Sequence, residues 1–431
     1  MAMEKIPGVK YMRDFYPDEM RLRGWIEDHW RKASLAAGFA EWDAPILENL
    51  DLYLRKSGAE IVGQLFNVVT QGEQKLAIRP EMTPSLARMI AAKQAALPRP
   101  IKWFCISRMC RYERGQRGRL REFWQWNADV LGLADAVADA ETISVAIDAL
   151  AAMGLTDADI EVRLNSRTLL AALLAGLGVP EEKHAAVYAV ADKRGKANSD
   201  DLARMYAEIG LDADLQSGVE NLLASKDLLD VERVVVDRKV TGHEGPLADL
   251  QRVFSHLAAL GKANYCKFDI GIVRGLAYYT GPVYEIFDKR GELRALAGGG
   301  RYDNLLGTMG GQAMPAVGFG MGDVVLGELL KDLGKLPAFA TLLDYYAIPM
   351  STERIDDALA VVATIRGRGK RADYAPAAGN LGKAFKRADA AGAAKVVLVG
   401  GAEWEAGQVK VKDMKSGEEQ AIALDVFLQS A

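Results

Sequence analysis

Residues 103–131 form two strand-like runs around an arginine-rich loop, and they constrain the fold more than any other stretch of the chain. Because side chains of a strand alternate between its faces, one face of the second run is polar apart from one aromatic residue. That face carries Arg121, Phe123, Gln125, Asn127 and Asp129, and the other carries Glu122, Trp124, Trp126, Ala128 and Val130. The pattern predicts a hairpin that binds anionic and amino-acid groups. The plainer interpretation is a hairpin with a solvated face and a basic tip.

Composition predicts two or three globular domains with real cores, since half of the 431 residues are hydrophobic and 26% are charged. The N-terminal stretch has no hydrophobic run, so we expect no signal peptide, no membrane span and a cytoplasmic location. A net charge of −4 confines any nucleic-acid surface to a local patch. The three cysteines lack metal-ligand spacing and are expected to be reduced: Cys105, Cys110 and Cys266.

Periodicity predicts helices on both sides of the hairpin. Apolar residues recur at helical spacing over residues 18–37, ending at Gly38, and over residues 134–153. Between them, residues 39–48 favour one strand that contains Pro45, which an edge strand tolerates. Residues 166–238 alternate short helical stretches with polar breaks and predict a helical insertion.

The C-terminal part has a different pattern of expected secondary structure. Residues 333–340 combine glycine, proline and small residues, as is typical of a linker. Beyond them, strand-like segments alternate with helical ones at 352–368 and 380–391, which predicts βαβ units and a small parallel or mixed sheet. Basic residues gather there in two groups, which we interpret equally well as nucleic-acid contacts or as solvated helix faces: Arg366, Arg368, Lys370 and Arg371, then Lys383, Lys386 and Arg387.

Several motifs identify a family. Arg111-Tyr112-Glu113, followed by a basic loop and by Arg121-x-Phe123, resembles motif 2 of the class II aminoacyl-tRNA synthetases. Within that class the chain resembles the histidyl-tRNA synthetases over nearly its whole length. The narrower resemblance rests on RPEMT at 79–83, VRGLAYYTGPVYE at 273–285, GGGRYDNLLGTMGG at 298–311 and PAVGFGMGD at 315–323.

The resemblance implies the following organisation. An α+β catalytic domain, with a mostly antiparallel sheet flanked by helices, would span 1–332 and carry the helical insertion at about 166–238. A linker at 333–340 would lead to a smaller α/β anticodon-binding domain at 341–431. The long helix and the proline-containing strand near the N-terminus resemble motif 1, which implies a homodimer.

The same resemblance assigns the amino-acid site. Arg111 and Arg274 would bind the substrate carboxylate and the α-phosphate, since a guanidinium stays charged and pairs with oxyanions at two points. The remaining histidine-binding residues divide between the α-amino group, with Glu81, Thr83 and Gln125, and the imidazole, with Asp129, Tyr278 and Tyr279. None of the chain's four histidines falls in a motif, which argues against a histidine base.

For the nucleotide, the resemblance assigns Arg111, Glu113, Arg121 and Phe123, with ATP and Mg²⁺ as co-substrates and neither a prosthetic group nor a protein metal site. Arg114 and Gln116 occupy the positions that touch the acceptor end of tRNA(His) in the family, and both side-chain types read purine edges. Arg301 and Asp303 are expected to be structural ion partners. The implied partners are L-histidine, ATP, tRNA(His) and a second copy of the chain, without a membrane.

The chain departs from the family pattern at three positions. Val325 stands where motif 3 has an ATP-binding arginine, Ala277 replaces an aspartate, and Asp129 replaces a longer glutamate. We interpret this as a branch of the family in which Arg119 or Arg121 contacts the γ-phosphate. The expected function is a histidine–tRNA ligase. The alternatives are a histidine-sensing regulatory paralogue of a biosynthetic transferase, which usually lacks the anticodon domain, and a non-catalytic tRNA-binding module.

Overall fold

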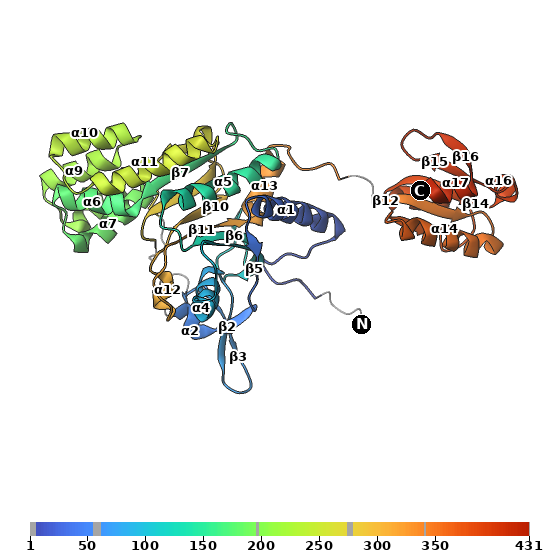
Figure 1. Ribbon diagram of the computed structural model, residues 1–431, viewed down its shortest axis with the longest axis horizontal. Coiled ribbons are helices and arrows are strands. Elements are labelled where there is room, and N and C mark those ends of the chain that lie inside the picture. The colour runs from blue at the N-terminus through green and yellow to red at the C-terminus, as the bar shows by residue number, and fades with distance from the viewer. Residues whose placement is uncertain (1–5, 55–61, 195–197, 274–278, 340–341, 431) are drawn as a thin grey trace. The chain divides into compact units, whose positions relative to one another are not determined.

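An eight-stranded sheet is the centre of the N-terminal part of the chain (Figure 1). The computed structural model describes residues 6–54, 62–194, 198–273, 279–339 and 342–430. Two compact units divide the chain, at 1–336 and 337–431. Among the described residues, no helix has both the length and the apolar character that a membrane crossing requires.

The large sheet is mostly antiparallel, as predicted. Its strands follow the order β1 (Ala40–Glu41), β5 (Ile101–Cys110), β6 (Glu122–Leu131), β11 (Ala316–Gly322), β10 (Ala297–Arg301), β9 (Pro282–Asp288), β7 (Ile160–Ser166) and β8 (Cys266–Phe268). Only the edge pairs β1–β5 and β7–β8 are parallel, and the inner pairs are antiparallel. The described sheet therefore confirms the predicted fold class.

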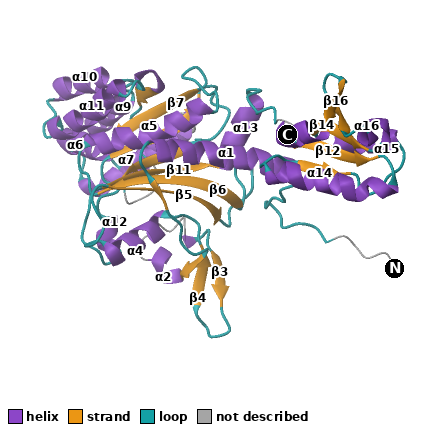
Figure 2. Cartoon of the chain, turned by 45° about the vertical axis from the view of Figure 1, so that its right-hand side comes forward, coloured by secondary structure: helices purple, strands orange, loops and turns teal. Residues whose placement is uncertain are grey.

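The hairpin predicted from alternation is the pair β5 and β6, with Ile101 opposite Leu131 and Cys110 opposite Glu122. The apolar face of β6 packs against the helices α1 (Pro17–Ala36) and α5 (Ala136–Ala152), which lie across this side of the sheet (Figure 2). Fully buried Trp126 stacks on Trp30 and donates to Ser34 Oγ at 3.0 Å. Burying such a side chain contributes about 1.5–3 kcal/mol, so the tryptophans fix which face of β6 is left for a site.

The opposite face of the sheet is covered at one end by α4 (Thr83–Lys93) and α12 (Leu305–Thr308). A small second sheet joins them, in the order β2 (Leu47–Asn49), β4 (Lys75–Ile78) and β3 (Phe66–Val69), with the short helix α2 (Leu50–Leu54). Helix α13 (Asp323–Asp332) directly follows β11.

One prediction about the N-terminal strand was wrong. Residues 39–48 do not form a single strand, because β1 and β2 belong to different sheets and Pro45 lies between them. Proline has no N–H group for a ladder. Arg79 fills the bend instead: its Nη1 donates to Asp43 Oδ1 at 2.8 Å and to the carbonyl of Ala44 at 2.5 Å.

The helical region begins where predicted but continues past residue 238. It comprises α6 (Arg167–Leu177), α7 (Glu181–Lys193), α8 (Ser199–Ile209), α9 (Ala213–Leu223), α10 (Leu228–Arg238) and α11 (Glu244–Ala259), and the 3-10 turn η1 (Ala263–Tyr265) follows. These helices share a hydrophobic cluster of their own. Val253 and Leu257 of α11 belong instead to the core around α5, so α11 joins the two clusters.

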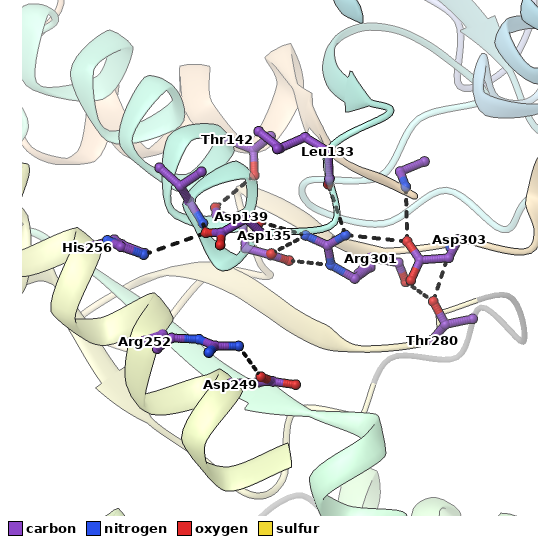
Figure 3. A network of polar contacts seen from close by, with 12 residues as sticks. Leu133, Asp135, Asp139, Thr142, Asp249, Arg252, His256, Thr280, Arg301 and Asp303 are labelled. Atoms are coloured by element: carbon purple, nitrogen blue, oxygen red, sulfur yellow. Dashed lines mark hydrogen bonds and ion pairs between the residues drawn. The ribbon is translucent and has the colours of Figure 1, made fainter. Parts of the chain in front are cut away.

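Arg301 ties the middle of the sheet to α5 (Figure 3). Its guanidinium pairs with Asp139 of α5, lies 3.4 Å from Asp303, and donates to the carbonyls of Leu133 and Asp135 at 3.3 Å each. Burial raises the pKa of Asp139 to about 6, against the opposing effect of Arg301. The expectation that Arg301 and Asp303 are structural ion partners is thus confirmed.

The C-terminal unit has the predicted alternation. Its mixed sheet follows the order β13 (Ala372–Tyr374), β12 (Leu343–Pro349), β14 (Ala393–Val399), β15 (Gln408–Asp413) and β16 (Glu419–Ala423). β12 pairs in parallel with β13 and β14, while β15 is antiparallel to its neighbours. The helical elements are η2 (Thr352–Arg354), α14 (Ile355–Gly367), α15 (Leu381–Ala390), α16 (Gly401–Glu405) and α17 (Leu424–Ser430).

Candidate active site

A cavity of about 330 Å³ opens on the polar face of the large sheet. It brings together many residues that the sequence singled out: Glu81, Thr83, Arg111, Glu113, Phe123, Gln125, Asp129 and Tyr279. They come from β6, from the loop after β5, from the start of α4 and from the segment before β9. Arg274 and Tyr278 lie outside the described residues.

Two glycines of β11 make room for the polar side chains of β6. Gly318 lies opposite Asp129, and a Cβ at Gly318 would lie 1.9 Å from Asp129 Oδ1. A Cβ at Gly320 would lie 2.0 Å from Gln125 Nε2. Since glycine is the residue that allows such close approach, the GFG sequence of this strand lets both side chains lie flat across the sheet.

We expect Gly318→Ala to displace Asp129 and to raise the KM for histidine about tenfold or more, because small misplacements at a reacting site are costly. Histidine-dependent exchange of pyrophosphate into ATP measures this, and circular dichroism checks the fold. Gly245→Ala is a matched control, since a Cβ there meets no atom within 4 Å and Gly245 does not line the cavity. An unchanged KM in the Gly318 variant would contradict the assignment of Asp129.

Asp129 is 2% exposed, and burial raises the pKa of its carboxyl to about 7, while a hydrogen bond from Tyr302 opposes that rise. The Tyr302 hydroxyl donates this bond to Oδ1. The second oxygen of the carboxylate retains acceptor capacity for a ligand. Tyr279 also lines the cavity, so a carboxylate and a tyrosine side chain both form part of its wall.

Arg111 is held from two sides. Its Nε donates to the carbonyl of Pro80 at 2.9 Å, and its Cζ lies 5.2 Å from the ring centroid of Phe123. Across the described part of the chain, no hydrogen bond uses the two terminal nitrogens of Arg111. The guanidinium is therefore preorganised, with its fork left for an oxyanion.

The loop between β5 and β6 does not bring all of its predicted residues to the cavity. Arg121 lies with its Cζ 4.2 Å from the ring centroid of Tyr112, donates to the carbonyl of Glu113 at 3.2 Å, and is not among the lining residues. Arg119 does line the cavity, and its Nε lies 2.5 Å from Glu113 Oε2. The expected nucleotide contact of Arg121 thus finds no support in this arrangement.

Arg114 and Gln116 also lie away from the cavity lining. Gln116 lines a neighbouring hollow between the loop, α13 and the N-terminal segment. The ring of Tyr11 packs on the loop backbone, where a Cβ at Gly115 would lie 2.1 Å from Tyr11 Cδ1. This contact explains why glycine stands at 115, since any side chain there would push Tyr11 away.

The comparisons decide the family. Residues 11–322 match the sequence model of histidyl-tRNA synthetase, and residues 344–430 match that of an anticodon binding domain. The chain belongs to the histidyl-tRNA synthetase family. This confirms the resemblance drawn from the motifs.

Relatives match the chain over nearly its whole length. A histidine–tRNA ligase of Opitutus terrae is 42% identical over 436 residues, 99% of either chain. A chloroplastic/mitochondrial histidine–tRNA ligase of Arabidopsis thaliana is 39% identical over 415 residues, 96% of this chain and 84% of the relative. The solved histidyl-tRNA synthetase of Nostoc sp. PCC 7120 shares the fold, with a TM-score of 0.85 and 24% identity over 99% of this chain and all of that one.

Sequence reasoning missed several cavity residues, among them Tyr302 and Arg294. Tyr302 was passed over because only Arg301 and Asp303 of the GGGRYD motif were assigned a role, although Tyr302 lies between them. Arg294 lies in no motif. The one sequence feature that could have pointed to it is its position shortly before the glycine run. Of that run, Gly298 lines the cavity, whereas a Cβ at Gly299 or Gly300 would meet the backbone and side chains of neighbouring strands.

Proposed function

We propose that the chain activates L-histidine with ATP to histidyl-adenylate and transfers the histidyl group to the 3′ end of tRNA(His). The observation that carries this proposal is the composition of one cavity. Glu81 and Thr83 offer oxygens to an ammonium, Arg111 offers a fork to oxyanions, and Asp129 offers a buried carboxylate to an imidazole. Family membership supports the same activity.

In the first step, an oxygen of the histidine carboxylate attacks the α-phosphorus, and the bond from that phosphorus to the bridging oxygen breaks to release pyrophosphate. Arg111 would bind both reacting groups, which offsets their mutual repulsion and aligns them. Arg274 would assist at the α-phosphate and Tyr278 at the imidazole. In the second step, a ribose hydroxyl of the tRNA attacks the carbonyl carbon of the adenylate, and AMP leaves with the former carboxylate oxygen.

Phe123 would stack on the adenine, and Glu113 would contact the nucleotide beside it. Glu113 and Glu285 also supply carboxylate oxygens to the cavity. Magnesium in nucleotide sites is typically held by one or two carboxylates together with substrate phosphates, so these residues fit a Mg²⁺ that arrives with ATP. When bound, the ion would neutralise charge on the phosphates.

The C-terminal unit would bind the anticodon region. Of the two basic groups, the first is used within the unit: Arg371 pairs with Asp344 at 3.0 Å, and Arg366 lies 3.7 Å from Asp373. Lys383, Lys386 and Arg387 of α15 are exposed, and among the described residues they have no ion pair. The phosphate contacts of the tRNA are therefore assigned to α15, and Arg114 and Gln116 keep their assignment to its acceptor end.

The domain assignment 1–332, 333–340 and 341–431, a homodimer and a cytoplasmic location belong to this proposal as well. The regulatory paralogue is the second candidate. The anticodon domain match at 344–430 and the oxyanion fork of Arg111 favour the ligase.

Histidine-dependent exchange of pyrophosphate into ATP tests the proposal. We expect exchange with histidine and none above background with other amino acids. Histidine binding by well-folded protein without any exchange would favour the sensor instead.

A further inference from the structure

We propose that Arg294, which no motif singles out, binds the β- and γ-phosphates of ATP. The inference rests on the proposed function for the identity of the anion. It concerns a residue that lines the cavity and lies three positions before the start of β10, on which Arg119 and Glu113 of the β5–β6 loop act electrostatically.

Arg294 has no ion pair among the described residues, although the charges of Glu113 and Glu285 act on it. Its side chain is exposed and lines the cavity. Within the described ranges, no hydrogen bond or ion pair engages Arg294. A five-donor group left open toward a cavity is a site for an oxyanion, and phosphate oxygens match its fork.

The charges around Arg294 indicate which part of a ligand it meets. Arg119, Glu113, Glu285 and Arg111 are the charged groups that act on it, so three guanidiniums and two carboxylates surround this end of the cavity. Partial burial, followed by repulsion from Arg119, lowers the pKa of Arg294 below its ordinary value. A polyphosphate that arrives with a divalent cation relieves both kinds of crowding, since it offers anionic oxygens to the arginines and the cation to the carboxylates.

The segment that carries Arg294 is fixed before any ligand binds. Leu296, two residues on, is 2% exposed, accepts from Gly322 N at 3.4 Å and donates to Ile286 O at 2.8 Å. Leu293 packs on the main core from the other side of Arg294. The guanidinium thus extends from a backbone anchored to strands on both sides, which lowers the ordering cost of binding.

Three arginines of the β5–β6 loop are paired or stacked within the protein. Arg119 pairs with Glu113, Arg121 lies over Tyr112, and Arg117 pairs with Asp332 at 2.7 Å. Val325 stands where the family pattern would place a cationic side chain. The β5–β6 loop packs closely against Val325, since a Cβ at Gly118 would lie 3.2 Å from Val325 Cγ2. Among the described arginines that line the cavity, only Arg111 and Arg294 have no ion pair, and Arg111 is already assigned to the α-phosphate.

Equilibrium binding of ATP and of AMP, both with MgCl₂, tests the assignment without requiring turnover. For Arg294→Ala we expect ATP to bind about 10- to 100-fold more weakly, as the loss of one charge-assisted contact predicts. AMP, which lacks the two outer phosphates, should bind as it does to the unmodified protein. Arg294→Lys should recover part of the loss. Arg290→Ala is the control, because Arg290 precedes the same strand, pairs with Asp288 at 3.1 Å and does not line the cavity.

Three outcomes with the Arg294→Ala variant would overturn the assignment: unchanged ATP binding, an equal loss for AMP, or a loss confined to tRNA charging. The last would make Arg294 a tRNA contact. Absence of ATP binding by the unmodified protein would likewise overturn it. Pyrophosphate exchange is measured separately. A protein that binds ATP through Arg294 but does not catalyse exchange would contradict the proposed function and would still support this inference.

Discussion

Arg111→Ala is expected to lower the rate of histidyl-adenylate formation about 10²- to 10³-fold, the usual loss when one preorganised donor is removed from a developing charge. We expect this loss because Pro80 and Phe123 hold the Arg111 guanidinium in place, while its two terminal nitrogens remain for an oxyanion. The effect should fall on kcat of pyrophosphate exchange more than on the KM for histidine, since the contact strengthens as charge develops.

Two further variants sharpen this prediction. Arg111→Lys keeps the charge but loses the two-point geometry, so it should recover only a small part of the rate. Arg108→Ala is the matched control: Arg108 lies on the same hairpin, with its Cζ 4.3 Å from the Trp124 ring centroid, and does not line the cavity. Equal losses in the Arg108 and Arg111 variants would show that the hairpin's stability, and not the fork, is what matters.

Asp129→Asn is expected to raise the KM for histidine about 10²-fold, because a charged hydrogen-bond acceptor in a desolvated site is lost. The amide oxygen can still accept from Tyr302, so the cavity should keep its shape. The KM for ATP should change little. Since the pKa of Asp129 is raised to about 7, kcat/KM for histidine in the unmodified protein should fall as the pH drops below about 7. The variant should lack this component, which separates it from titration of the histidine substrate itself.

Asp129→Asn should weaken histidine binding but raise the thermal stability of the fold. A carboxyl whose folded pKa lies above its ordinary value stabilises the fold at low pH, and that contribution is lost as the pH rises through the folded value. For Asp129 the loss runs from about pH 4 to about pH 7. Asp129→Asn should therefore raise Tm relative to the unmodified protein at pH 8, and less so at pH 5. A variant that is less stable at pH 8, with histidine binding intact, would contradict the buried carboxylate.

Much of the fold could be predicted from local sequence patterns. The alternation of polar and apolar residues, such as Gln125 and Trp126, was enough to predict the hairpin, and the structure packs its tryptophan face into the core. The helices and the C-terminal alternation followed from periodicity in the same way. Pro45 misled, because a proline marks a break without saying that the next strand joins a different sheet.

What the sequence could not supply was register between distant segments. Gly318 meets Asp129 only because β11 pairs with β6, some 190 positions earlier in the chain. Tyr302 reaches Asp129 for the same reason, through a strand that neighbours β11. Arg121 and Arg119 carry the same charge in the same loop, and only the packing of Tyr112 and Glu113 decides which of them faces the cavity.

A crystal structure with L-histidine and a non-hydrolysable ATP analogue tests the central claim most directly. The account predicts both ligands in the one cavity, with the Arg111 fork within about 3 Å of the carboxylate and the α-phosphate, as charge-assisted bonds require, and with the imidazole on Asp129. Histidine bound in another cavity would contradict it, and so would an imidazole that makes no hydrogen bond to Asp129.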